Sequence, residues 1–104
     1  MSGWPDPGTQ LERALVRGAA DAGIALRVMP AESTRWASVT FTGARHRLRL
    51  VAPVSSSLDD WLAALPEAEF RLRGHLVADL VVTAESRTGE QAEATLEILT
   101  VEDC

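Results

Sequence analysis

Alternation of apolar and polar residues is clearest between Phe70 and Ala84. Every second residue from Phe70 onwards is apolar or small, whereas the residues between them are of mixed character. Successive side chains of a strand point to opposite faces of a sheet, so this period predicts a β-strand with one face in a core. The segment is long for one strand, and we expect Gly74 to mark a bend or bulge within it.

Helical periodicity marks two other segments. Thr9 begins the first, because it and the glutamate three residues later have the T-x-x-E spacing of a capping box. Apolar residues then recur every three or four positions, which predicts a helix over 10–22 after a poorly ordered tail at 1–8. A second, shorter helix is predicted to begin with a cap at Ser57 and to end at Pro66.

Four shorter segments are rich in β-branched residues or alternate in polarity, and each is predicted to be a strand. In the second of them, Ala37, Val39 and Phe41 are expected to face the core. Gly43 and Ala44 are expected to form the turn that follows. The predicted strands cover 24–28, 36–42, 45–51 and 91–101.

The predicted order of elements is α-β-β-β-α-β-β, or α-β-β-β twice if the long strand divides at Gly74. Short connections favour antiparallel neighbours, and two helices are too few to cover both faces of a sheet. We therefore expect one α+β domain over 9–104. It would be a two-layer sandwich in which a mainly antiparallel sheet of five or six strands carries both helices on one face. Residue identity between the halves is thin, so internal duplication is a hypothesis.

Composition places the chain among ordinary globular proteins. Its 104 residues suit one domain, and no apolar run is long enough to cross a bilayer. The N-terminus lacks the features of a signal peptide, and Cys104 is the only cysteine, so a cytoplasmic protein is expected. All ten basic residues are arginine, while lysine, asparagine and tyrosine are absent. The codons of a GC-rich bacterial genome explain that bias.

Charge is unevenly distributed along the chain. Residues 1–54 contain seven arginines and four acids, giving +3, whereas 55–104 contain three arginines and eleven acids, giving −8. Together these make the net charge of −5, which is unfavourable for general nucleic-acid binding. The simplest interpretation is that basic and acidic strands neighbour each other in one sheet.

Along the predicted strands, most arginines occupy the positions that alternate with the core-facing residues. This parity, or odd–even placement, predicts a surface rich in arginine on the side of the sheet away from the helices. Such a face could receive an acidic protein segment, a phosphate-bearing ligand or single-stranded nucleic acid. Alternatively, Glu93, Glu97 and Asp79 pair with the arginines and form a solvated surface of mixed charge. The residues assigned to this face are Arg27, Arg45, Arg47, Arg49, Arg71 and Arg73, with His75 and Trp36 at its margin.

Candidate catalytic groups are few. His46 has core parity and is expected to be a packed, hydrogen-bonded residue. His75 and Asp79 would lie about 13 Å apart along one strand, too far for direct contact. The serine run 55–57 is explained by helix capping, and no metal-binding or cofactor-binding motif is present. We therefore predict no catalytic residue, no metal and no cofactor.

Two functions from different classes remain open. The first is a non-enzymatic domain that forms a homodimer or binds a protein partner through the open, arginine-rich face. The second is a small-molecule-binding protein or small enzyme with a pocket between helices and sheet, using His46 or His75. A concave apolar cavity reached by a histidine would favour the second, and a filled core with both histidines hydrogen-bonded to backbone would favour the first. Binding of single-stranded nucleic acid is the least favoured.

Overall fold

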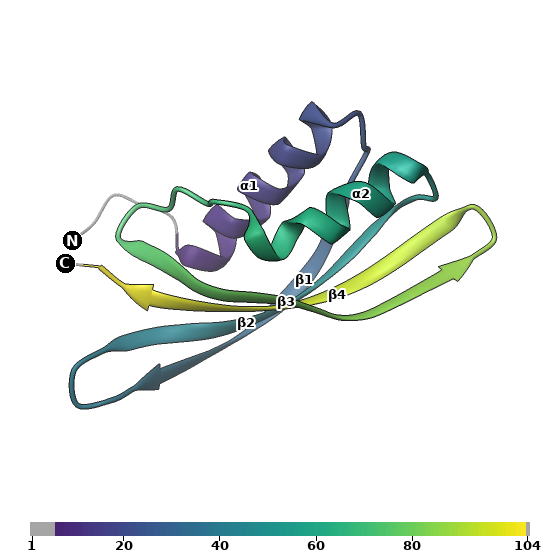
Figure 1. Ribbon diagram of the computed structural model, residues 1–104. Helices are drawn as coiled ribbons and strands as arrows, with labels where there is room; N and C mark the ends of the chain where they lie inside the picture. Colours follow the sequence, from purple (N-terminus) through teal and green to yellow (C-terminus); the bar gives the residue numbers. More distant parts are fainter. Residues whose placement is uncertain (1–5, 104) are drawn as a thin grey trace.

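Two helices cover one face of an antiparallel sheet, so the predicted two-layer α+β fold is confirmed (Figure 1). The computed structural model describes residues 6–103, apart from the side chains of residues 30 and 31. The strands lie in the order β1-β2-β4-β3. The elements are α1 (Pro7–Asp21), β1 (Arg27–Ala37), β2 (Thr42–Pro53), α2 (Ser56–Ala64), the short 3-10 helix η1 (Leu65–Glu67), β3 (His75–Thr88) and β4 (Gln91–Glu102).

The first edge strand joins segments that the sequence predicts as separate. β1 runs through Pro30, and its register against β2 shifts between Met29 and Glu32. Proline has no backbone N–H to donate, so a local irregularity accommodates it in an edge strand. The described residues therefore form four strands, or five ladder segments if β1 is divided at the shift.

The chain repeats one αββ unit. α1, β1 and β2 form the first unit, and α2, β3 and β4 form the second. Corresponding elements begin 48 or 49 residues apart, at 7 and 56, 27 and 75, and 42 and 91. The last strands of both units pair antiparallel at the centre of the sheet, and the two hairpin loops lie at opposite ends (Figure 1). The repeated unit is αββ rather than αβββ, and a common origin of the halves stays a prediction.

The long strand starts later than predicted. β3 begins at His75, because Gly74 before it adopts a φ of +79°, which turns the chain. Phe70 and Leu72 precede this bend and pack, partly buried, against the hydrophobic core. They are thus core residues as expected, although they lie in a connection and not in the sheet.

Two bulges change which residues of β3 face the helices. The register against β4 shifts after Val77 and again after Val82. Each extra residue reverses the alternation of faces. The bend at Gly74 starts β3 out of phase with the predicted alternation, so Leu76 is exposed, and Ala78 lies exposed in the first bulge. The extra residue of this bulge restores the predicted phase, and Leu80 is buried as predicted.

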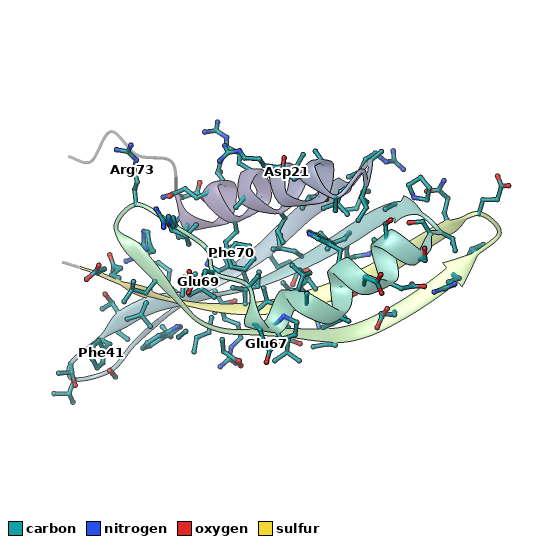
Figure 2. All side chains as sticks on the ribbon, turned by 45° about the horizontal axis from the view of Figure 1, so that its top comes forward. Asp21, Phe41, Glu67, Glu69, Phe70 and Arg73 are labelled. Carbon is teal, nitrogen blue, oxygen red and sulfur yellow. The ribbon has the colours of Figure 1, made fainter. Side chains whose placement is uncertain are left out.

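The β1–β2 hairpin also differs from the prediction. Ala37, Val39 and Phe41 are exposed and not part of the core, because this hairpin extends past the helices (Figures 1 and 2). The turn covers 38–41: the Ser38 N–H donates to the Phe41 carbonyl oxygen at 2.7 Å, and the Phe41 N–H donates to Ser38 Oγ at 3.1 Å. Gly43, predicted in the turn, lies buried within β2.

Both helices begin with side-chain caps that lie two or three residues before the predicted ones. Asp6 caps α1 by accepting the Thr9 N–H at 2.9 Å, with Pro7 in the first turn. Ser55 caps α2 by accepting the Leu58 N–H at 3.0 Å. The predicted capping roles of Thr9 and Ser57 therefore pass to residues slightly upstream.

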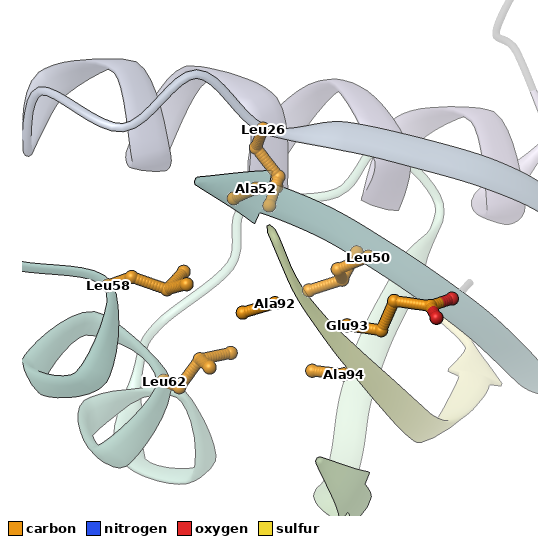
Figure 3. A pocket seen from close by; sticks show the side chains of 8 residues that line it. All are labelled: Leu26, Leu50, Ala52, Leu58, Leu62, Ala92, Glu93 and Ala94. Atoms are coloured by element: carbon orange, nitrogen blue, oxygen red, sulfur yellow. The ribbon is translucent and has the colours of Figure 1, made fainter. Parts of the chain in front are cut away.

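Leucines from both helices and the central strands fill the space between the layers. A void of about 10 Å³ remains between α2 and the sheet (Figure 3), which is barely enough for one water molecule. Trp61 of α2 packs against this core, as its place in the apolar stripe predicts. The fully buried residues at the centre are Leu11, Leu15, Leu48, Leu50, Leu96 and Ile98.

Candidate functional site

The sheet surface away from the helices, hereafter the open face, carries the arginines of β2. Arg45, Arg47 and Arg49 are exposed and alternate with buried residues of the same strand, as the sequence predicts. Arg27 of β1 pairs with Val51 and extends the same surface. The predicted basic face therefore exists for these four arginines.

Arg71 and Arg73 do not belong to the open face. Both lie in the connection before β3, because the strand predicted from Phe70 begins only at His75. The backbone of Arg73 is held by Gln10 of α1: its N–H donates to Gln10 Oε1 at 2.6 Å, and its carbonyl oxygen accepts from Gln10 Nε2 at 3.1 Å. Figure 2 shows Arg73 beside the start of α1, on the helix side of the molecule.

Acidic side chains of β4 accompany the arginines of β2. Arg47 and Glu97 approach to 3.9 Å, and Arg49 and Glu93 to 2.5 Å. These side chains are 38–60% exposed, so each pair contributes about 0–1 kcal/mol to stability. Two of the three acids expected to balance the arginines do so, while Asp79 forms no ion pair with a described residue.

Apolar side chains also lie on the open face. Met29, Leu76 and Val81 are 37%, 56% and 45% exposed. Trp36 is half-buried and packs over Gly43, where a Cβ atom would come within 2.8 Å of the indole Cζ2. The buried indole Nε1 has no hydrogen-bond partner among the described residues. The open face is therefore a mixture of charged and apolar side chains.

A concave region lies where α1 begins over one end of the sheet. This cleft, hereafter the histidine cleft, has a volume of about 320 Å³. His75 faces it from the helix side of the sheet, so its predicted place at the margin of the arginine face is wrong; the bend at Gly74 resets the parity. The polar residues that line the cleft are Asp6, Ser33, Arg35, His46, His75 and Glu102.

Hydrogen bonds join three strands beneath this cleft. Ser33 Oγ lies 2.8 Å from His46 Nδ1, and His46 Nε2 lies 3.0 Å from Thr100 Oγ1. The Thr100 hydroxyl donates to the Ala44 carbonyl oxygen at 3.3 Å. His46 is 1% exposed and Thr100 is 0% exposed, so the expectation of a packed, hydrogen-bonded His46 is confirmed. Its partners are side chains and not backbone groups.

The electrostatics of the cleft favour a neutral His46. Burial lowers the pKa of its imidazole below the ordinary 6.5, because desolvation disfavours the charged form. The carboxylate of Asp6 opposes this shift, and the neighbouring His75 adds to it. The Thr9 N–H holds the pKa of the Asp6 carboxyl below its usual value by stabilising the carboxylate.

Stability is expected to decrease as the pH falls through 6.5. The pKa of His46 is lower in the folded state, so the unfolded chain takes up the proton first, and acid favours unfolding. Asp6 acts in the same direction below 3.8. Urea unfolding at pH values on either side of 6.5 measures the slope of the free energy of unfolding against pH. His46→Gln should remove most of it and His75→Gln should not; a slope unchanged in His46→Gln would contradict the assignment.

Sequence reasoning missed most of the histidine cleft. Ser33 lies between two predicted strands, Asp6 lies in the predicted tail, and Thr100 lies near the end of the last predicted strand. Only the two histidines were singled out, and both reach the cleft. The core between α2 and the central strands is filled apart from a void of about 10 Å³, whereas a hollow of about 680 Å³ lies between α2 and β3.

Comparisons with family models, curated proteins and solved structures found no match. Within residues 6–103, no helix is long and apolar enough to cross a membrane. The same residues contain no group of three or more histidine, cysteine, aspartate or glutamate side chains placed to hold a metal ion. The open face and the histidine cleft are therefore the two surfaces from which a function can be inferred.

Proposed function

We propose that the protein acts through association and that its partner is a second copy of itself, bound through the open face. The supporting observation is a self-complementary arrangement of charge. β2 presents a basic column of Arg45, Arg47 and Arg49, and the adjacent β4 presents an acidic column of Glu93 and Glu97. A surface with both signs in neighbouring columns can pair with a copy of itself.

In the proposed dimer, the two copies are related by a two-fold axis that runs parallel to the strands, between β2 and β4. Rotation about this axis places each basic column over the acidic column of the other copy, at the same height along the strands. Face-to-face sheets lie about 10 Å apart, a distance that arginine and glutamate side chains span together. Because the pairs within one copy are weak and exposed, they can exchange partners across the interface.

The same axis brings apolar residues of the edge strands together. Trp36 of β1 and Leu76 of β3 belong to one row of the sheet, because both connect through Gly43 and Val101. Rotation places Trp36 of each copy over Leu76 of the other. Leu76 is 56% exposed in the single chain, and its burial would contribute roughly 25 cal/mol per Å² of apolar surface.

Charge reversal tests this proposal. Arg47→Glu sets glutamate against Glu97 of the other copy, and Glu97→Arg sets arginine against arginine, so each variant alone should dimerise less. Two repulsive pairs per dimer, at about 1 kcal/mol each, raise the dissociation constant roughly 30-fold. Mixing the two variants restores opposite charges in both pairs, and native mass spectrometry should show the heterodimer.

Arg71→Glu is the matched control, because it makes the same charge change away from the open face. It should leave the dimer intact. A wild-type chain that stays monomeric at high micromolar concentration would overturn the proposal. So would a mixture of the two reversed variants that associates no better than either one alone.

A further inference from the structure

The histidine cleft holds a serine hydroxyl in direct contact with a buried imidazole. Ser33 is an exposed residue, and its Oγ lies 2.8 Å from His46 Nδ1, within the range of a nucleophile activated by a base. We propose that Ser33 is a nucleophile and His46 its general base, in a site that takes the acyl group of small, uncharged esters. This inference is independent of self-association through the open face.

The hydrogen-bond network assigns a direction to the pair. The Thr100 hydroxyl donates its proton to the Ala44 carbonyl oxygen, so its oxygen is left to accept from His46 Nε2. A neutral imidazole with its proton on Nε2 has a lone pair on Nδ1. The Ser33 hydroxyl therefore donates to Nδ1, as a nucleophile does to its base. Thr100 is the positioning residue that holds this tautomer.

The surroundings support both protonation states that the reaction needs. Burial keeps the resting imidazole neutral, as its lowered pKa reflects. The carboxylate of Asp6 interacts favourably with the imidazolium that forms when His46 accepts the proton. Asp6 is held at the start of α1 by the Thr9 N–H, so this negative charge has a fixed place in the cleft.

Acyl transfer to Ser33 forms one C–O bond and breaks another. Ser33 Oγ forms a bond to the ester carbonyl carbon, its proton passes to His46 Nδ1, and the carbonyl π electrons move to oxygen. The carbonyl reforms as the C–O bond to the alcohol breaks, and the leaving oxygen takes the proton from Nδ1. Water then attacks the Ser33 ester with the same base, which releases the carboxylic acid and restores the serine.

The walls of the cleft limit the substrate. A volume of about 320 Å³ is at the small end of ligand pockets, which favours a short acyl chain. Among the described residues that line the cleft, one carries a guanidinium, Arg35, and two carry carboxylates, Asp6 and Glu102, so the fixed charge disfavours an anionic substrate. His75 Nδ1 is buried without a hydrogen-bond partner among the described residues.

The test uses p-nitrophenyl acetate, a short neutral ester, with the full chain. We expect a burst of nitrophenol close to one equivalent and an acetyl group on Ser33 by peptide mapping. Ser33→Ala should lose the burst, while Ser38→Ala, which changes an exposed serine of the β1–β2 turn, should keep it. Urea midpoints measured in parallel show that both variants are folded. Acetylation spread evenly over other serines, or an unchanged burst in Ser33→Ala, would overturn the inference.

Thr100 gives a second, independent readout. Thr100→Val removes the hydroxyl that fixes the tautomer and should slow acylation at least about 10-fold, whereas Thr100→Ser keeps a hydroxyl and should restore the rate. The acylation rate should rise with pH as His46 loses its proton, and the midpoint of this rise should lie below 6.5. The charged and titratable groups that line the cleft around His46 are Asp6, Arg35, His75 and Glu102. Equal rates in Thr100→Val and the wild type would contradict the role of the network.

Discussion

Replacing Gly43 with alanine is expected to lower the free energy of unfolding by roughly 3 kcal/mol, at the upper end of overpacking effects. An added Cβ would lie 2.0 Å from the Thr100 carbonyl oxygen and 2.8 Å from Trp36 Cζ2. The Trp36 ring can rotate, but the carbonyl belongs to the backbone of β4. Relief therefore requires β2 and β4 to separate at this end of the sheet, where Gly43 pairs with Val101.

Urea unfolding of wild type and variant measures this difference directly. Gly89→Ala is the matched control: Gly89 has a φ of +62°, but a Cβ there meets no atom within 4 Å. Conformational strain without a clash should cost about 1 kcal/mol. If Gly43→Ala were no more destabilising than Gly89→Ala, the close approach of β2 and β4 would be wrong.

The helices and the fold class were predictable because their signals are local. A helical stripe is set by residues three and four apart, and a cap by residues three apart. The predicted range 10–22 overlaps nearly all of α1 at Pro7–Asp21. The start was placed too late because Asp6 and Pro7 form the cap and first turn, and they lie in a segment whose composition suggested a tail.

Parity was predictable only where a strand runs without bulges. β2 alternates uninterrupted, so the arginines at 45, 47 and 49 were placed correctly on the open face. β3 contains two register shifts, and the chain before it bends at Gly74. Bulges depend on how the partner strand fits, and nothing in the local pattern announces them. Arg71, Arg73 and His75 precede both bulges; they leave the surface that strand parity assigns to them because the chain bends at Gly74 and β3 begins only at His75.

The histidine cleft was not predictable from the sequence, because its members meet only through the register of three strands. Ser33 pairs with His46 across β1 and β2, and His46 pairs with Ile98, two residues from Thr100, across β2 and β4. A single serine, histidine or threonine carries no signal of such a contact. What the pattern does indicate is that His46 is buried, and a buried imidazole requires hydrogen-bond partners.

Replacing Leu96 with alanine is expected to destabilise the fold by about 2–5 kcal/mol. Leu96 is fully buried and lies at the centre of the sheet, paired with Leu48 on one side and Val82 on the other. Both αββ units meet along this central pair of strands, so neither can relax inwards without disturbing the other. The lost methyl groups therefore leave a cavity that the surrounding backbone cannot close.

Leu76→Ala on the open face is the matched control, because it removes the same atoms from a side chain that is 56% exposed. It should change stability by about 0.5 kcal/mol or less in the monomer. Urea unfolding at low protein concentration separates this from any loss of the dimer, in which Leu76 is proposed to contact Trp36. Equal effects of the two substitutions would mean that the core is not centred on β2 and β4. A large effect at Leu76 that appears only at high protein concentration would instead locate that residue in the self-association surface.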